Sequence, residues 1–357
     1  MCAVKEKDFS DIDPNFKQKN EHEFHLEYHD VVEAPIVLEG LPFVNDDGRR
    51  SRLPRKTAEL MIKRRTGPAM QTAGGLIRFR TDSPEIGVRV RQDEYYVNYN
   101  KRMSAGFDLY TGCAPDMKFL GSHLMADAVE EYAFSWKPRT DGMRDFSIYL
   151  PVMCSFFKIE IGIAEGCALE APTPRRHRPG IAFYGSSITN CGAASRPGML
   201  YPAIIGRMMD YETINVGFAG ACLGETCIAD QIAKLDLSAF VLEYDHNAPS
   251  PEFLRQTHEP FFKYFRKLRP DLPVLMLSMP YADFSSEAIQ ERRAIIVRTW
   301  LNAFESGDRQ VEFLDGETFF AGAAREDCSV DACHQNDLGE RLMAECIADR
   351  LKRMIRG

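Results

Sequence analysis

Residues 181–357 alternate between short apolar runs and longer amphipathic stretches, five times in succession. The runs cover residues 181–184, 213–218, 240–244, 274–279 and 311–314. The stretches at 200–209, 225–235, 251–268, 286–304 and 337–354 have helical spacing. Five consecutive strand–helix units predict an α/β fold, in which helices cover both faces of a parallel sheet. Ligands bind at the carboxyl ends of such strands, so residues directly after each run are the candidates for function.

Residues 20–170 follow a different period. Apolar and polar residues alternate at 24–29, 76–80, 85–91, 132–136, 146–150 and 158–163, with turn sequences such as TDSP between them. This pattern predicts an all-β, jelly-roll-like sandwich, in which residues 57–65 are a helical insertion. The connector APTPRRHRPG, residues 171–180, is polar and stiffened by three prolines. We therefore expect a flexible segment at 1–20, a β-sandwich at 21–172 and the α/β domain at 173–357.

Charge and cysteine usage narrow the class of protein. The net charge of −8 and the pI near 5.6 argue against a nucleic-acid or anionic-membrane partner. We interpret the basic segment at 49–65 as a loop and helix face over the core rather than as an anion site. No apolar run is long enough for a membrane span or a signal sequence, so the cytoplasm is the expected location. Ten cysteines without a C-x-x-C pair predict buried free thiols.

Polar residues of the kinds used in acyl transfer follow three of the predicted strands. GSSIT, with Ser187, follows the first strand and is either a plain turn or a nucleophile site, although it lacks the G-x-S-x-G pattern. NVGFAG ends at Gly220, which either makes a tight turn or presents its N–H to a ligand. Asn247 either caps the next helix or donates its amide to an oxyanion. Asp331 and His334 follow the last strand, at the same edge of the sheet.

Together these residues fit one reaction. A serine hydroxyl is a weak nucleophile and needs a base, which His334 can supply while Asp331 holds its tautomer. The tetrahedral oxyanion needs fixed donors, each contributing roughly 3 kcal/mol. The N–H groups of Ser187 and Gly220 and the amide of Asn247 would supply three.

The blocks GSSIT, NVGFAG, DHNAP and DACHQNDLGERL, in this order and spacing, resemble the four blocks of the SGNH (GDSL-like) hydrolase superfamily. The resemblance implies a flavodoxin-like three-layer α/β/α fold with a five-stranded parallel sheet. It also implies Ser187 as the nucleophile, Asp331 and His334 as the rest of the triad, and Gly220 and Asn247 as oxyanion donors. No metal or organic cofactor is needed.

Two positions depart from the usual SGNH pattern. Ser186 stands where the family has aspartate, and Ala248 follows the block's asparagine where aspartate is usual. Neither position does the chemistry, so these departures concern the subfamily and the substrate. The β-rich half, with RFRTDSPEIGVRV and YLP, resembles the N-terminal sandwich of two-domain SGNH esterases, many of which are similar to carbohydrate esterases.

We therefore expect a serine esterase that cleaves short-chain acyl esters, acetyl first, of a carbohydrate or small-molecule alcohol. An acyltransferase with the same triad and a non-catalytic carbohydrate-binding protein are the alternatives, and the oligomeric state stays open. A metal hydrolase built on Asp245, His246 and His334 is disfavoured, because the sequence has no H-x-x-x-H or comparable spacing.

Overall fold

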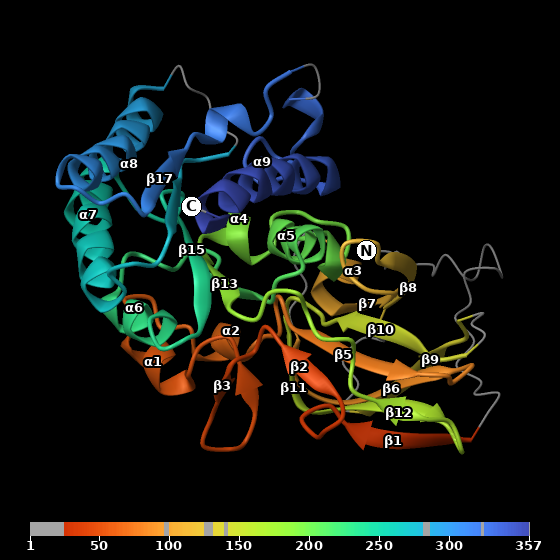
Figure 1. The fold of residues 1–357 in the computed structure, drawn as a ribbon. Coiled ribbons are helices and arrows are strands. Elements are labelled where there is room, and N and C mark those ends of the chain that lie inside the picture. Colours follow the sequence, from red (N-terminus) through yellow and green to blue (C-terminus); the bar gives the residue numbers. More distant parts are fainter. Residues whose placement is uncertain are drawn as a thin grey trace, which may run out of the picture.

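The computed structural model describes residues 25–95, 100–124, 131–138, 142–280, 286–322 and 325–356. Two antiparallel sheets form most of the N-terminal half, and a parallel sheet between helices forms the C-terminal half (Figure 1). The segment predicted to be flexible, residues 1–20, lies outside these ranges.

The parallel sheet confirms the predicted α/β architecture. Its five strands have the order β14-β13-β15-β16-β17, so the chain starts inside the sheet and the later strands extend to one side. The strands are β13 (Gly180–Gly185), β14 (Thr213–Gly217), β15 (Leu237–Glu243), β16 (Val274–Leu277) and β17 (Val311–Leu314). The first four begin and end within a few residues of the predicted runs, and β17 matches its run residue for residue.

Helices cover both faces of this sheet. On one face, α5 (Tyr201–Met209) and α9 (Asp337–Arg356) pack over Phe183, Val241 and Leu275. On the other, α6 (Thr226–Ile232), α7 (Pro251–Leu268) and α8 (Glu287–Glu305) pack over Tyr184 and Leu242. Figure 1 shows the two sets on opposite sides of the strands. The three-layer prediction is therefore confirmed.

The β-rich half is a sandwich whose two antiparallel sheets share one apolar core. One sheet has the order β1-β11-β6-β9, with β1 (Leu26–Asp30), β6 (Ile86–Tyr95), β9 (Glu131–Trp136) and β11 (Cys154–Ala164). The other has the order β12-β5-β10-β7-β8, with β5 (Leu76–Thr81), β7 (Gly106–Thr111), β8 (Lys118–Leu124), β10 (Arg144–Tyr149) and β12 (Leu169–Glu170). Short strands β2 (Val37–Glu39), β3 (Phe43–Val44) and β4 (Arg50–Ser51) and helix α3 (Lys101–Ala105) complete this half.

The expected helix at 57–65 is shorter in the structure. Helix α1 (Arg55–Leu60) ends at Met61, whose backbone is extended, and a separate helix α2 (Thr66–Met70) follows. The buried side chain of Met61 joins the core beneath α6 and α7, and this packing overrides the helical spacing of the following residues.

The two halves share apolar packing and polar contacts. Leu53, Ala58 and Ala69 belong to the same core cluster as the parallel sheet, although they precede the connector by about a hundred residues. Arg175 of the connector pairs with Glu39 of β2 at 2.6 Å. The division at residue 172 thus remains a prediction, and residues 53–69 pack with the α/β half.

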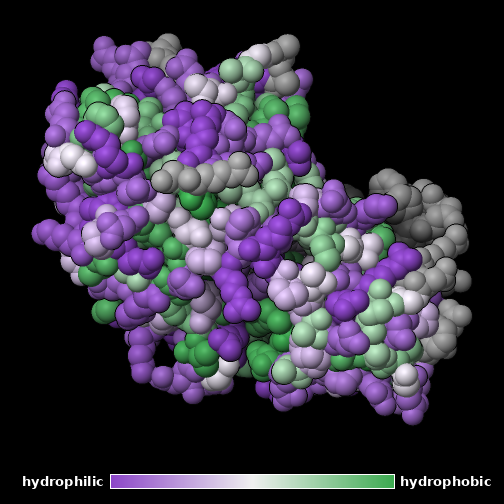
Figure 2. Space-filling model, in the orientation of Figure 1, coloured by the Kyte–Doolittle hydropathy of each residue, from purple (hydrophilic) through white to green (hydrophobic). Residues whose placement is uncertain are grey.

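The surface, the helices and the cysteines bear on the expectations about a membrane span and about buried thiols. Polar residues cover most of the face shown in Figure 2, with apolar residues between them in small groups. None of the helices in the described ranges is long and apolar enough to cross a membrane. The nine described cysteines are free thiols, as predicted, but only Cys154, Cys191, Cys222 and Cys328 are buried. Cys113 is exposed, and the other four are partly buried.

Candidate active site

The ends of three neighbouring strands bring the predicted blocks together. Gly185, the last residue of β13, lies opposite Gly217 of β14 on one side and Glu243 of β15 on the other. The chain segments that follow these three residues therefore leave the sheet at one edge. The loop between β17 and α9 carries Asp331 and His334 to the same edge.

Ser187 is the first residue of a short helix, α4 (Ser187–Asn190). Ser186 precedes it as the N-cap, and its hydroxyl accepts a hydrogen bond from the Ile188 N–H at 3.1 Å. The Ser187 Oγ lies 2.8 Å from Nε2 of His334, 147 residues further along the chain. The two serines of the GSSIT block thus differ in structure, because one caps the helix and the other contacts an imidazole.

Asp331 holds the other side of this imidazole. Its Oδ2 lies 2.8 Å from His334 Nδ1, and its Oδ1 accepts hydrogen bonds from the backbone N–H groups of His334, at 2.7 Å, and Cys333, at 3.0 Å. Burial alone would raise the pKa of Asp331, but these hydrogen bonds outweigh it and lower the pKa. The ionised carboxylate can therefore accept a hydrogen bond from the Nδ1–H group, and this tautomer allows Nε2 to take a proton from Ser187.

Two backbone N–H groups at this edge have no acceptor among the described residues, those of Ser187 and Gly220. The Ser187 N–H is free because it is at the start of a helix. Gly220 has a φ of +63°, in the left-handed region where a glycine is favoured. A Cβ at Gly220 would lie 3.8 Å from Nη2 of Arg65, so a cation from the β-rich half borders this loop.

The structure excludes one of the two roles considered for Asn247. Helix α7 is capped by Ser250, whose hydroxyl accepts from the Phe253 N–H at 3.1 Å, so Asn247 is not the cap. The amide nitrogen of Asn247 lies 3.2 Å from the Phe218 carbonyl oxygen and 3.4 Å from that of Cys222. Its N–H groups thus point at the loop that contains Gly220, and the longer contact is near the limit for a hydrogen bond.

Glu243 lies beneath the serine turn and escaped the sequence analysis. Its carboxylate accepts hydrogen bonds from the Ser186 N–H at 3.1 Å, the Ser186 hydroxyl at 2.9 Å and the Thr189 hydroxyl at 2.8 Å. Burial raises the pKa of Glu243, and the bonds from Thr189 and Ser186 oppose that rise. Glu243 lies within β15, and the expectation that functional residues follow the strands therefore did not include it. The available signal was a charged residue inside the apolar run FVLEY.

Asp245, His246 and Cys333 lie next to the candidate triad. Burial and the nearby Glu243 raise the pKa of Asp245 to about 8. Burial and the charge of His334 lower the pKa of His246 to about 3, and its Nδ1 lies 3.7 Å from the Cys333 sulfur. Within the described ranges, no three His, Cys, Asp or Glu side chains are arranged to hold a metal ion.

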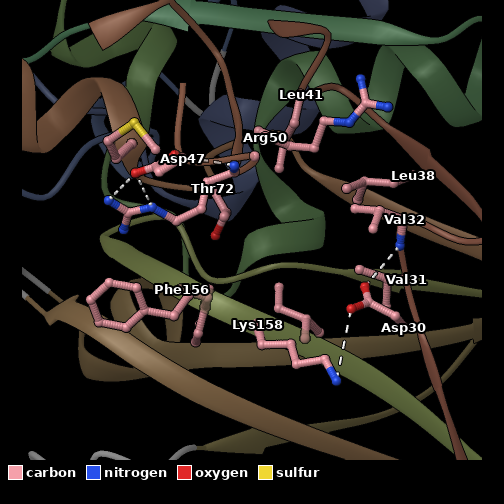
Figure 3. Close-up of a pocket in the computed structure, with 15 residues that line it drawn as sticks. Asp30, Val31, Val32, Leu38, Leu41, Asp47, Arg50, Thr72, Phe156 and Lys158 are labelled. Carbon is pink, nitrogen blue, oxygen red and sulfur yellow. Dashed lines mark hydrogen bonds and ion pairs between the residues drawn. The ribbon is translucent and has the colours of Figure 1, made fainter. Parts of the chain in front are cut away.

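A cavity of about 220 Å³ lies in the β-rich half and is lined by none of these residues. Its apolar wall includes Leu38, Leu41 and Phe156, and ion pairs stand at both ends (Figure 3). Asp47 pairs with Arg49 at 2.9 Å, and Asp30 with Lys158 at 3.9 Å. Because these carboxylates are paired and no serine or histidine lines the cavity, it has no nucleophile with a base.

A serine, a histidine and a carboxylate in hydrogen-bond sequence at the edge of a parallel sheet have the geometry of acyl transfer. Residues 178–356 match the model of the GDSL-like lipase/acylhydrolase family, and residues 26–169 match the model described as the N-terminus of Esterase_SGNH_hydro-type. The chain belongs to the GDSL-like lipase/acylhydrolase family, and it is a carboxylic ester hydrolase. The predicted SGNH resemblance is thereby confirmed. No curated protein sequence matches the chain.

Several solved structures share the fold along most of the chain. A protein described as a GDSL-like lipase from Bacteroides ovatus is 24% identical, with 93% of this chain and 98% of that chain covered and a TM-score of 0.81. The salicylyl-acyltransferase SsfX3 of a tetracycline biosynthetic pathway is 18% identical, with 90% and 95% covered and a TM-score of 0.76. An acetyl xylan esterase, Est2A, from the rumen bacterium Butyrivibrio proteoclasticus is 11% identical, with 92% and 98% covered and a TM-score of 0.61.

Proposed function

We propose that this protein is a serine esterase that cleaves short-chain acyl esters of a carbohydrate or a small-molecule alcohol. Acetyl is the acyl group that we propose to test first. One observation carries the proposal. The Ser187 hydroxyl, both nitrogens of His334 and the Asp331 carboxylate form one chain of two 2.8 Å contacts. A hydroxyl oxygen 2.8 Å from an imidazole nitrogen is within reach for proton transfer.

In the first half-reaction, Ser187 Oγ attacks the ester carbonyl carbon while its proton passes to His334 Nε2. The resulting imidazolium is stabilised by the Asp331 carboxylate through the Nδ1 proton. The carbonyl oxygen becomes an oxyanion, for which Ser187 N–H, Gly220 N–H and the Asn247 amide are the proposed donors. The carbon–oxygen bond to the alcohol then breaks, and the alcohol leaves with the proton from His334.

In the second half-reaction, water replaces the alcohol. His334 Nε2 takes a proton from the water as its oxygen attacks the acyl carbon. The same donors stabilise the second oxyanion. The bond between the acyl carbon and Ser187 Oγ breaks, the serine recovers its proton from His334, and the carboxylic acid is released.

The substrate class rests on the structural relatives. An acetyl xylan esterase and a family two carbohydrate esterase from Clostridium thermocellum, solved in complex with cellohexaose, share the fold with TM-scores of 0.61 and 0.59. The activities named here are those of the two relatives. For this chain they motivate a screen of acetylated sugars beside simple alcohol esters, with acyl chains of increasing length.

An acyltransferase is the second candidate, and the similarity to a salicylyl-acyltransferase with a TM-score of 0.76 favours testing it. Both activities share the acyl-enzyme and differ in whether water or an alcohol resolves it. A donor ester is supplied with rising concentrations of sugar or alcohol acceptors, and free acid and new ester are quantified. Hydrolysis predominates if free acid remains the main product at saturating acceptor.

The catalytic assignment is tested with p-nitrophenyl acetate. Ser187→Ala and His334→Ala are expected to lower kcat by about 10⁴-fold or more. Ser238→Ala is the control, since this hydroxyl donates to the Pro179 carbonyl at 3.2 Å and lies near the start of β15, at the opposite end from Glu243. Wild-type rates in Ser187→Ala would overturn the assignment. Absence of turnover in every variant and in the wild type, across the ester screen, would favour a carbohydrate-binding protein.

A further inference from the structure

Arg52, a residue of the β-rich half, has its side chain buried between the two halves. It lies between β4 and α1, and it has no exposed surface. Its neighbours in sequence, Arg50 and Arg55, remain at the surface or partly so. The expectation that the whole basic segment covers the core from outside is therefore wrong for Arg52.

The guanidinium of Arg52 contacts both chain segments that carry the proposed chemistry. Its Nη1 donates to the Asn190 side-chain oxygen at 3.0 Å, and Asn190 is the last residue of the helix that begins at Ser187. The same nitrogen donates to the backbone oxygen of Gly217 at 2.7 Å, and Gly217 is three residues before Gly220. Nη1 also lies 3.2 Å from the Asn215 carbonyl oxygen. One group thus connects the serine helix to the end of β14.

The other nitrogens connect this group to the β-rich half. Nε donates to the Gln71 carbonyl at 3.1 Å, and Nη2 donates to the Pro68 carbonyl at 2.9 Å. The guanidinium also lies 4.5 Å from the centre of the Phe218 ring, at the start of the Gly220 loop. Each nitrogen of the guanidinium therefore has an acceptor, and hydrogen bonds to both halves hold the guanidinium in place.

All the acceptors around Arg52 are uncharged. They are four backbone carbonyls and one amide, and no carboxylate in the described ranges pairs with Arg52. Burial lowers the pKa of Arg52 to about 10, so the group stays positively charged at neutral pH. A buried charge without an opposite charge is costly to remove from water, and here only hydrogen bonds to neutral acceptors offset that cost. This cost calls for an explanation beyond packing.

Close packing between the serine helix and β14 leaves little tolerance in their relative position. A Cβ at Gly217 would lie 2.5 Å from the Asn190 backbone nitrogen. The side-chain nitrogen of Asn215 donates to the Thr189 carbonyl at 2.7 Å, and its oxygen accepts from the Gly217 N–H at 2.9 Å. Arg52 donates to the free carbonyls and amide oxygen around this same contact.

We propose that Arg52 is a positioning residue of the active site, which sets the distance and angle between Ser187 and the Gly220 N–H. The inference rests on the proposed function, because it assigns a role to Arg52 through those two residues. The β-rich half is then part of the catalytic machinery, since it supplies the group that aligns nucleophile and oxyanion donor. A shift of about 1 Å in such an alignment lowers rates by roughly 10²-fold.

The test uses the full-length protein with p-nitrophenyl acetate. Arg52→Lys keeps the charge but loses the planar fork, and we expect kcat to fall roughly 10²-fold while KM changes less than about threefold. Arg175→Lys is the matched control, because Arg175 is also buried between the halves but pairs with Glu39 and Asp210. We expect Arg175→Lys to keep kcat even if its melting temperature falls as far as that of Arg52→Lys.

A second variant keeps the proposal testable if Arg52→Lys does not fold. Asn190→Ala removes one hydrogen-bond acceptor of the Arg52 guanidinium, and we expect kcat to fall about tenfold with KM unchanged. In Arg52→Ala, added guanidinium chloride at low millimolar concentration is expected to restore kcat at least tenfold, without effect on Arg175→Ala. In the double variant Arg52→Lys, Asn190→Ala, the losses in kcat are expected to be less than multiplicative. The reason is that both substitutions break the same hydrogen bond, the one between Arg52 and Asn190.

Three results would overturn the proposal. They are a wild-type kcat in folded Arg52→Lys, an equal loss of kcat in Arg52→Lys and Arg175→Lys, and a wild-type kcat in Asn190→Ala. Failure of the proposed function is separate, because it would appear as activity that survives Ser187→Ala. A rise in KM with unchanged kcat in the Arg52 variants would instead assign Arg52 to substrate binding.

Discussion

Replacing Asp331 with asparagine is predicted to disable His334 without unfolding the protein. The Asp331 Oδ1 accepts two backbone hydrogen bonds, at 2.7 Å and 3.0 Å, and Oδ2 faces His334 Nδ1 at 2.8 Å. An asparagine keeps the two backbone bonds by placing its oxygen at the Oδ1 position. Its NH₂ group then faces Nδ1 and forces the proton onto Nε2, so the imidazole cannot accept a proton from Ser187.

The size of the effect follows from these contacts. Turning the amide over would restore the correct tautomer but would break both backbone bonds, at about 3 kcal/mol in total. The variant also loses the charge-assisted bond that stabilises the imidazolium, which contributes about 1.5–3 kcal/mol. Because 1.36 kcal/mol corresponds to a factor of ten, kcat is expected to fall roughly 10³- to 10⁴-fold.

The assay is p-nitrophenyl acetate turnover, measured with the melting temperature of each variant. Asp327→Asn is the control, because Asp327 is an exposed acid in the same loop. We expect the control to keep wild-type kcat and both variants to melt within a few degrees of the wild type. A folded Asp331→Asn variant that keeps more than a tenth of wild-type kcat would refute the tautomer argument.

Three further predictions concern the surrounding groups. Asn247→Ala should lower kcat about 10²- to 10³-fold with little change in KM, measured by steady-state kinetics, and a change confined to KM would argue against an oxyanion role. Glu243→Ala removes the acceptor of the Ser186 N–H, the Ser186 hydroxyl and the Thr189 hydroxyl, of which Thr189 keeps its contact with Tyr201. It should lower the free energy of unfolding by roughly 3 kcal/mol in urea titrations, whereas Glu243→Gln should lower it less. Burial raises the pKa of Asp245 to about 8, above its unfolded value near 3.8, so the folded state binds the extra proton between these values. The unfolding free energy should therefore fall as pH rises from about 4 to about 8, by up to about 1.4 kcal/mol per unit, and Asp245→Asn should flatten this slope. An identical slope in the variant would show that Asp245 does not cause it.

The secondary structure of the α/β half was predictable because its signal is local. Each strand of the parallel sheet is an apolar run buried on both faces, and each helix has one apolar face, so both read directly in the sequence. In the β-rich half, six strands with clear alternation were predicted, but β7, β8 and the short strands β2, β3, β4 and β12 were not. All six residues of β7 are buried, so it lacks the alternation of a half-exposed strand.

The candidate site was predictable only in part. Ser187, Gly220, Asn247, Asp331 and His334 are candidates because four short blocks keep their order and spacing, not because any block is distinctive alone. Their proximity depends on the strand order, which places three chain segments at one edge. The exclusion of Asn247 as a helix cap also needed the structure, because Ser250 caps α7.

Hydrophobic period and turn chemistry act over a few residues, so the sequence was enough to predict which segments form strands and helices and which residue types are available for acyl transfer. Which charges are buried, and what they touch, depends on contacts between distant segments and became visible only in the folded chain. Arg52 meets Asn190 and Gly217 across 138 and 165 residues of chain, and Glu243 meets Ser186 across 57. Burial of a charge depends on such distant partners, so no local pattern marks Arg52 or explains what Glu243 does.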